Sequence, residues 1–227
     1  MGGSGSSFSS QKKLSVEGLE YSADLDEFKH INAQDEGRRR RIIDWTKKNH
    51  KKVEDLYYEA QEARLNQLAQ NAKEIDYDEA FRIINDNIRQ SDGRGWFVDA
   101  NSDYKPRIFS AIMSNPEVLN AGWNVAYMHY KWQVEEDNRN GGNQKTLSFK
   151  QWLRTPQTYY RGSTSDRMVS SDRWVSYTNR QSIANRFATQ AEGARVSYMK
   201  IRPMETLGSY QDTGEAETFI PRWKVKK

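Results

Sequence analysis

The sequence YYRG at residues 159–162, followed by WVSYT at 174–178 and GEAETFIP at 214–221, decides how the last third of this chain folds. Aromatic and β-branched residues are frequent in these segments, which favours short strands. Each segment also carries polar residues of a kind that binding sites use. They are an arginine at a strand end, a pair of hydroxyls, and two carboxylates separated by one residue.

The two carboxylates belong to Glu215 and Glu217. In an extended chain, residues i and i+2 point to the same face, so we expect both side chains to project together. Neighbouring carboxylates repel each other, and such pairs lie either fully in solvent or at sites that use them. A solvated acidic turn after Gly214 is one interpretation. The apolar Phe219 and Ile220 favour the other, a position at the rim of a core.

The arginine and the hydroxyls have ordinary interpretations as well as functional ones. Arg161 precedes Gly162. A guanidinium recognises phosphate through paired hydrogen bonds, and a glycine lets a ligand approach the backbone. Arginine at a strand end is also common in surface salt bridges. Ser176 and Thr178 alternate onto one strand face, where hydroxyls are frequent without any function.

In this order, the three segments resemble the Arg–Ser–Glu branch of the NAD-dependent ADP-ribosyltransferases, which includes arginine-modifying bacterial toxins and vertebrate ecto-enzymes. The phrase EAETFIPR is similar to the Glu-x-Glu ending of the arginine-specific members. Residues 181–188 have helical spacing, as does the helix after the hydroxyl strand in that family. The resemblance is close over 155–227 and extends by architecture over 78–227. It implies an α+β fold, with two small sheets around an NAD cleft and a helical region before them.

The resemblance implies a role for each matching residue. Arg161 would contact the phosphates or ribose of NAD, and the backbone of Gly162 would meet the nicotinamide carboxamide. Ser176 would hold Glu217 by a hydrogen bond, with Thr178 in support. The hydroxyl strand reads Ser-Tyr-Thr where the family has Ser-Thr-Ser, and about fourteen residues separate Arg161 from Ser176, which is short for the family.

Three further roles complete the implied site. Glu217 would bind the 2′-hydroxyl of the nicotinamide ribose and stabilise the positive charge that develops as nicotinamide leaves. Glu215 would receive an acceptor arginine. Tyr210 would be an aromatic residue of the loop that recognises the acceptor.

The activity implied is mono-ADP-ribosylation of an arginine on a target protein, with NAD as substrate and no metal. Such enzymes are bacterial effectors or phage-encoded modifiers of host proteins. Two alternatives stay open. One is an inactive copy of the fold that acts as a binding module through a basic helix. The other is an NAD glycohydrolase or a modifier of nucleic acid, against which Glu215 speaks.

The composition argues against disulfides, metal sites and membrane segments. The chain has no cysteine and three scattered histidines, so we expect neither disulfides nor a thiolate or histidine metal site. It has no apolar run near the ~18 residues of a membrane span, and no signal peptide is seen, which favours a cytoplasmic protein without membrane contact. The opening MGGSGSS formally matches a myristoylation pattern but is typical of a flexible linker.

We expect three regions: a linker at 1–13, a helical extension at 14–77 and the catalytic domain at 78–227. The extension holds a basic stretch at 38–52, with eight Lys or Arg against one acid. It could bind host machinery associated with nucleic acid, or be a solvated helix face. Apolar spacing and capping residues predict further helices. These span residues 36–72, 78–88, 105–113, 116–135 and 149–153.

Overall fold

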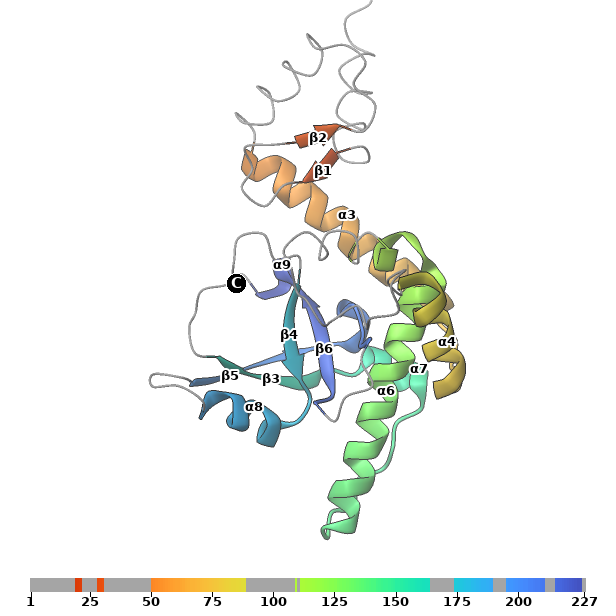
Figure 1. Ribbon diagram of the computed structural model, residues 1–227, viewed down its shortest axis with the longest axis vertical. Coiled ribbons are helices and arrows are strands. Elements are labelled where there is room, and N and C mark those ends of the chain that lie inside the picture. Colours follow the sequence, from red (N-terminus) through yellow and green to blue (C-terminus); the bar gives the residue numbers. More distant parts are fainter. Residues whose placement is uncertain are drawn as a thin grey trace, which may run out of the picture. The chain divides into compact units, whose positions relative to one another are not determined.

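The structure is a computed structural model (Figure 1). It describes residues 19–21, 28–30, 50–88, 109, 111–163, 174–189, 195–210 and 215–225. The chain divides into two units, Met1–Arg64 with Val169–Ser171, and Leu65–Met168 with Asp172–Lys227. The expected linker at 1–13 and nearly all of the basic stretch at 38–52 lie outside the described residues.

The first unit contains a short antiparallel pair of strands and the beginning of a long helix. The strands are β1 (Leu19–Tyr21) and β2 (Phe28–His30), and the helix is α3 (His50–Asn71). The end of α3 belongs to the second unit, which also holds every element described below. No helix in the described part of the chain is long and apolar enough to cross a membrane.

Helices α4 (Tyr77–Ile88) and α6 (Pro116–Arg139) pack against each other. The buried residues of α4 are Ala80, Ile84 and Ile88, which lie four residues apart and so form one stripe. Helix α6 begins at Pro116, where the sequence predicts a helix, and the Asn115 side chain caps it by accepting a hydrogen bond from Glu117 N at 3.0 Å.

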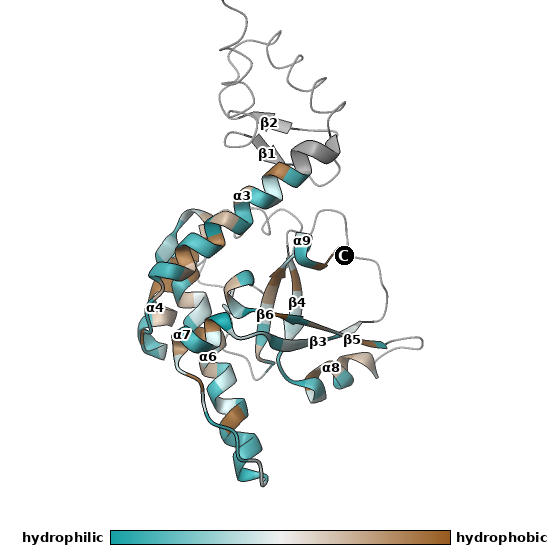
Figure 2. Cartoon of the chain, turned by 180° about the vertical axis from the view of Figure 1, so that it is seen from behind, coloured by the Kyte–Doolittle hydropathy of each residue, from teal (hydrophilic) through white to brown (hydrophobic). Residues whose placement is uncertain are grey.

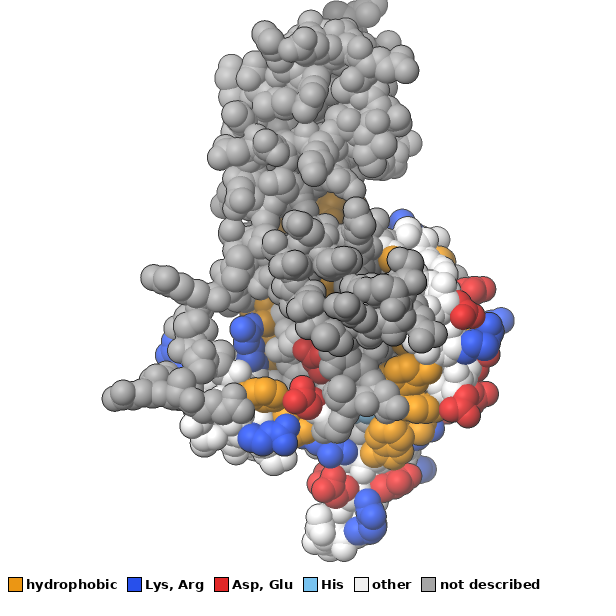
Figure 3. All heavy atoms as spheres, viewed as in Figure 1, with side chains coloured by type: hydrophobic (Ala, Val, Ile, Leu, Met, Phe, Trp, Pro, Cys, Tyr) orange, Lys and Arg blue, Asp and Glu red, His pale blue; other side chains and the backbone are white. Residues whose placement is uncertain are grey.

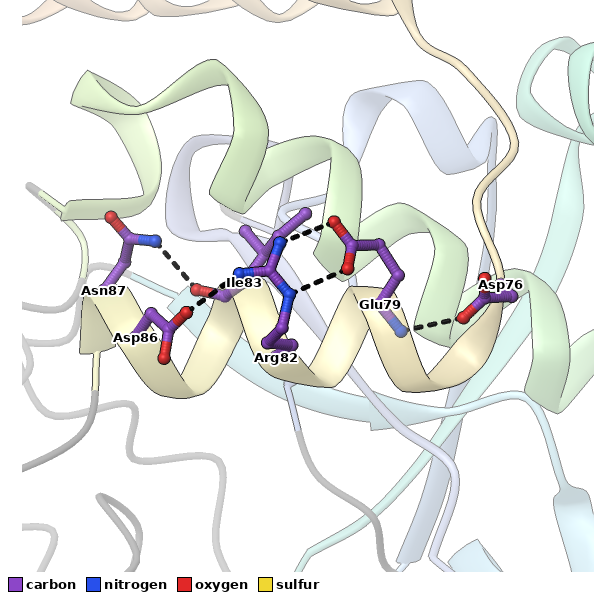
Figure 4. A network of polar contacts seen from close by, with 6 residues as sticks. All are labelled: Asp76, Glu79, Arg82, Ile83, Asp86 and Asn87. Carbon is purple, nitrogen blue, oxygen red and sulfur yellow. Dashed lines mark hydrogen bonds and ion pairs between the residues drawn. The ribbon is translucent and has the colours of Figure 1, made fainter.

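The start of α4 corrects one prediction. The sequence predicts this helix over 78–88 with Asp78 as its capping residue, but the side chain of Asp76 accepts the hydrogen bond from Glu79 N, at 2.8 Å (Figure 4). The helix begins earlier because the rings of Tyr77 and Phe81, one turn apart, pack with their centroids 4.7 Å from each other. The pattern therefore predicted the helix and misplaced its cap by two residues.

Helix α6 also fixes the connection between α3 and α4. Asn124 accepts a hydrogen bond from Ile75 N at 3.0 Å and donates one to Lys73 O at 2.9 Å. Asn120 accepts from Lys73 N at 2.9 Å. Asn124 is 1% exposed, so these bonds satisfy its buried side-chain amide.

A four-stranded antiparallel sheet follows the short helix α7 (Phe149–Arg154), in the order β5-β3-β4-β6. Strands β3 and β5 pair along their full length, as do β4 and β6, whereas β3 meets β4 only at Tyr160 opposite Thr178. Figure 1 shows β3 and β5 lying across the direction of β4 and β6. The α+β class is confirmed. The strands are β3 (Gln157–Ser163), β4 (Trp174–Thr178), β5 (Arg195–Ile201) and β6 (Glu217–Pro221).

Both faces of the sheet bury apolar side chains. One face carries a cluster of Tyr159, Val175, Tyr177, Ile201 and Ile220. The ring of Phe219 lies on the other face, stacked on Trp174 at 4.9 Å and 5.8 Å from Tyr210. Figure 2 shows more brown along β4 and β6 than along β3, in keeping with the polar sequence of β3. Helix α8 (Gln181–Ala188) packs mainly on β3.

Glycines let the loop at 206–210 cross helix α6. Ser209 N donates to Gly122 O at 2.8 Å, and a Cβ on Gly208, whose φ is +83°, would overlap the backbone of Gly122. The same loop pairs with the outer edge of β6 through Leu207 N to Phe219 O (2.8 Å) and Phe219 N to Gly208 O (2.9 Å). The loop therefore fixes β6 against α6.

A small ionic cluster holds the end of the described chain. Glu205, in the 3-10 turn η1 (Pro203–Glu205), accepts from Arg202 Nε and from Lys224 Nζ of α9 (Arg222–Val225), both at 3.0 Å. Burial would raise the pKa of Glu205, but these hydrogen bonds outweigh it and lower the pKa to about 2. The carboxylate is therefore charged at neutral pH.

Candidate functional site

The sheet order makes neighbours of the three strands that carry the polar signals. Within the β4–β6 pair, Thr178 lies directly opposite Glu217, and Ser176 lies opposite Phe219. Directly opposed residues share a face, so Ser176 is the diagonal neighbour of Glu217. Ser176 is exposed, Thr178 is buried and Glu217 is half-buried. The structure thus brings Ser176, Thr178 and Glu217 together, with Thr178 as the closer partner across the strands.

Thr178 connects the β6 turn to the start of α8. Its Oγ1 donates to the backbone oxygen of Glu215 at 2.8 Å and accepts from Arg180 N at 3.1 Å. Both partners are backbone groups, and Glu215 is 37 residues away in the sequence. The resemblance implied only a supporting role for Thr178. In the structure, its hydroxyl joins the turn before Glu217 to the residues before α8.

The two carboxylates do not share a strand face, and that expectation was wrong. Strand β6 begins at Glu217, and Ala216 before it has a φ of 48°, the only positive φ of a non-glycine residue in the described part of the chain. A left-handed residue ends the extended geometry that the i, i+2 rule requires. Glu215 lies instead in a turn, with its Oε1 3.7 Å from Nη2 of Arg186 on α8.

Arg161 acts on Tyr177, a residue to which the sequence analysis assigned no role. Side chains alternate along β3, so Arg161 points to the face opposite that of Tyr160, and it pairs with Ser197 of β5. Burial raises the pKa of Tyr177, while the charge of Arg161 and a hydrogen bond with Ser197 act against that rise. The structure therefore groups Arg161 with Tyr177 and Ser197, and not with Ser176.

Gly162 is in close contact with helix α8. A Cβ at this position would overlap the carbonyl oxygen of Ala184 and lie 2.8 Å from Ala188 N. Both of these are backbone atoms, so no side-chain rotation could make room. The glycine that the sequence assigned to a ligand is thus required by the packing of α8.

Tyr210 is a core residue. Its side chain is 2% exposed, it packs beside Phe219, and a Cβ on Gly122 would lie 2.5 Å from its ring. Burial raises its pKa well above the ordinary value of a tyrosine. The ring would have to leave the core to contact an acceptor, and the residues that follow it, 211–214, lie outside the described part.

A pocket of about 150 Å³ lies next to Thr218, between α6, α7 and β3. A cavity of about this volume accommodates one six-membered ring. Trp152, which is 1% exposed, and Asn179 contribute to its lining, and Trp152 Nε1 and Asn179 Oδ1 have no hydrogen-bond partner among the described residues. The pocket therefore has room for one six-membered ring with polar substituents.

Comparison of the chain with protein-family models, with curated proteins and with solved structures found no match.

Proposed function

We propose that this chain transfers ADP-ribose from NAD to an arginine of a target protein. One observation carries the proposal: Ser176, Thr178 and Glu217 lie together on one face of the β4–β6 pair, and Glu217 stands at the first position of β6, opposite Thr178. Glu217 is half-buried, so its side chain is held in place by its neighbours and is still reached by solvent. This position supports a role in binding a substrate.

The proposed chemistry needs charge stabilisation more than proton transfer. When the bond between the ribose and nicotinamide breaks, positive charge develops on the ribose, and a fixed carboxylate such as Glu217 lowers the energy of that state. The guanidinium of the acceptor attacks the same carbon. Glu215 orients the guanidinium and accepts the proton that is lost.

Contact with a guanidinium supports the role of Glu215. Its carboxylate already lies 3.7 Å from Arg186 of the same chain, and the side chains are 43% and 62% exposed. An exposed ion pair of this kind contributes about 0–1 kcal/mol, so an acceptor arginine can displace Arg186. Arg186 thus stands where the acceptor guanidinium is proposed to bind.

The same contact favours a second candidate, NAD hydrolysis. While Arg186 occupies Glu215, no acceptor is oriented there, and water is left as the nucleophile. An enzyme with this arrangement would release nicotinamide without modifying protein.

The test uses NAD labelled in its adenylate part, the full chain, and agmatine as a small guanidino acceptor. We expect nicotinamide release together with labelled agmatine. Nicotinamide release without labelled agmatine or labelled lysate protein would favour the hydrolase. Absence of both nicotinamide release and NAD binding by calorimetry would overturn the proposal.

Ala216→Gly is expected to reduce transfer to agmatine about tenfold, because a looser turn no longer holds Glu215 apart from Glu217. The free energy of unfolding should change by no more than about 1 kcal/mol, since glycine adopts a positive φ easily but loses more chain entropy. Label transfer, nicotinamide release and thermal denaturation are measured on the same preparations. A large loss of stability would show that Ala216 acts on the fold and not on the carboxylates.

A further inference from the structure

Helices α4 and α6 expose an aromatic cluster away from the proposed site residues. The ring of Tyr77 lies 5.5 Å from Trp132, and Phe81 adjoins Tyr77 at 4.7 Å. Trp132 is 37% exposed, and Tyr77 and Phe81 are half-buried. In the described part of the chain, the exposed large hydrophobic side chains are Trp132 and Tyr198.

Carboxylates surround this cluster. Segment 73–88 holds five carboxylates against two basic residues, and segment 128–139 holds three against two, although the whole chain has a net charge of +4. Asp78 precedes Phe81 by three residues and Glu135 follows Trp132 by three, so each lies on the same helix face as an aromatic ring. Both are exposed.

The basic residues nearest to the cluster are already paired. Arg82 contacts Glu79 at 2.7 Å and Asp86 at 3.1 Å (Figure 4), and Lys131 lies 3.8 Å from Glu74. Figure 3 shows hydrophobic side chains gathered beside α4 and α6, with acidic and basic side chains around them. Of the described residues that form this surface, the charged ones are the carboxylates Asp78 and Glu135.

We propose that this aromatic–acidic surface, formed by Tyr77, Phe81, Trp132, Asp78 and Glu135, binds a segment rich in Lys and Arg on the protein that is modified. Cations are attracted to the faces of aromatic rings, and carboxylates steer basic chains toward them. The same charge repels nucleic acid. That the bound protein is also the acceptor of ADP-ribose rests on the proposed function. The binding itself does not, because it is measured without NAD.

The binding experiment uses the full chain and a fluorescent peptide of alternating Arg and Ser. Trp132→Ala is expected to raise the Kd for the peptide three- to tenfold, and Glu135→Lys should raise it by the same factor. Trp132→Phe should raise the Kd less, because it keeps an aromatic ring. Tyr198→Ala is the matched control, because Tyr198 is 74% exposed on β5 and lies outside the surface. Its Kd should stay at that of the unchanged chain, and added salt should weaken binding by the unchanged chain.

The activity experiment separates this surface from the catalytic site. With the same peptide as acceptor, Trp132→Ala should raise the KM and leave kcat unchanged, and the KM for agmatine should not change. Equal Kd values for Trp132→Ala and the unchanged chain would overturn the inference. So would concentration-dependent self-association that Trp132→Ala abolishes, which would assign the surface to a second copy of the chain.

The two proposals fail in different ways. Peptide binding that depends on Trp132 in a chain without any nicotinamide release would remove the proposed enzyme and keep the basic partner. Arginine modification that Trp132→Ala leaves intact, with unchanged peptide binding, would keep the enzyme and remove this surface. Thermal denaturation of Trp132→Ala and Trp132→Phe shows whether either change acts through the fold.

Discussion

Glu217→Gln is expected to lower transfer of ADP-ribose at least about 10³-fold, while the fold stays intact. Glutamine keeps the size of the side chain and its place opposite Thr178. It removes the negative charge that we propose stabilises the ribose as nicotinamide leaves. Nicotinamide release and label on agmatine should fall together, because both require that bond to break.

Glu205→Gln is the matched control for this change. It is the same substitution at a carboxylate that binds Arg202 and Lys224 and lies outside the proposed site. We expect Glu205→Gln to lose about 1–3 kcal/mol of unfolding free energy and to keep its kcat. Retention of more than about a third of the activity by Glu217→Gln would exclude this carboxylate from the reaction.

The sequence predicted those elements whose signal is local. Apolar spacing from Pro116 onward predicted α6, and the aromatic and β-branched segments predicted β3, β4 and β6. The position of Asp76 as the cap of α4 escaped prediction, since the packing of Tyr77 on Phe81 decides where that helix begins. The choice of the capping residue depends on contacts between side chains one turn apart. The preference of aspartate for capping positions does not predict those contacts.

The sequence predicted which residues belong to the candidate site. It did not predict how their side chains are arranged in space. Register places Thr178 opposite Glu217, and no pattern within either strand contains that register. The left-handed backbone of Ala216 turns Glu215 toward Arg186, and alanine gives no sign of a positive φ. The charge of Arg161 acts on Tyr177 across two strands, and this too depends on a register that neither strand contains.

Gly162→Ala is expected to destabilise the second unit by about 3 kcal/mol or more and to lower its Tm by about 10 °C. The added methyl group would meet the backbone of α8 at Ala184 and Ala188, so the helix has to move away from β3. Helix α8 carries Arg186, so its displacement would also move the partner of Glu215.

Gly141→Ala separates this clash from the general effect of replacing a glycine. Gly141 has a φ of +96° and nothing within 4 Å of an added Cβ, so its substitution should cost only about 1 kcal/mol of backbone strain. Thermal denaturation of both variants compares steric overlap with strain. If Gly162→Ala melted like the unchanged chain and yet released no nicotinamide, the glycine would be needed for a ligand at the backbone. The packing of α8 would then not be the reason that glycine follows Arg161.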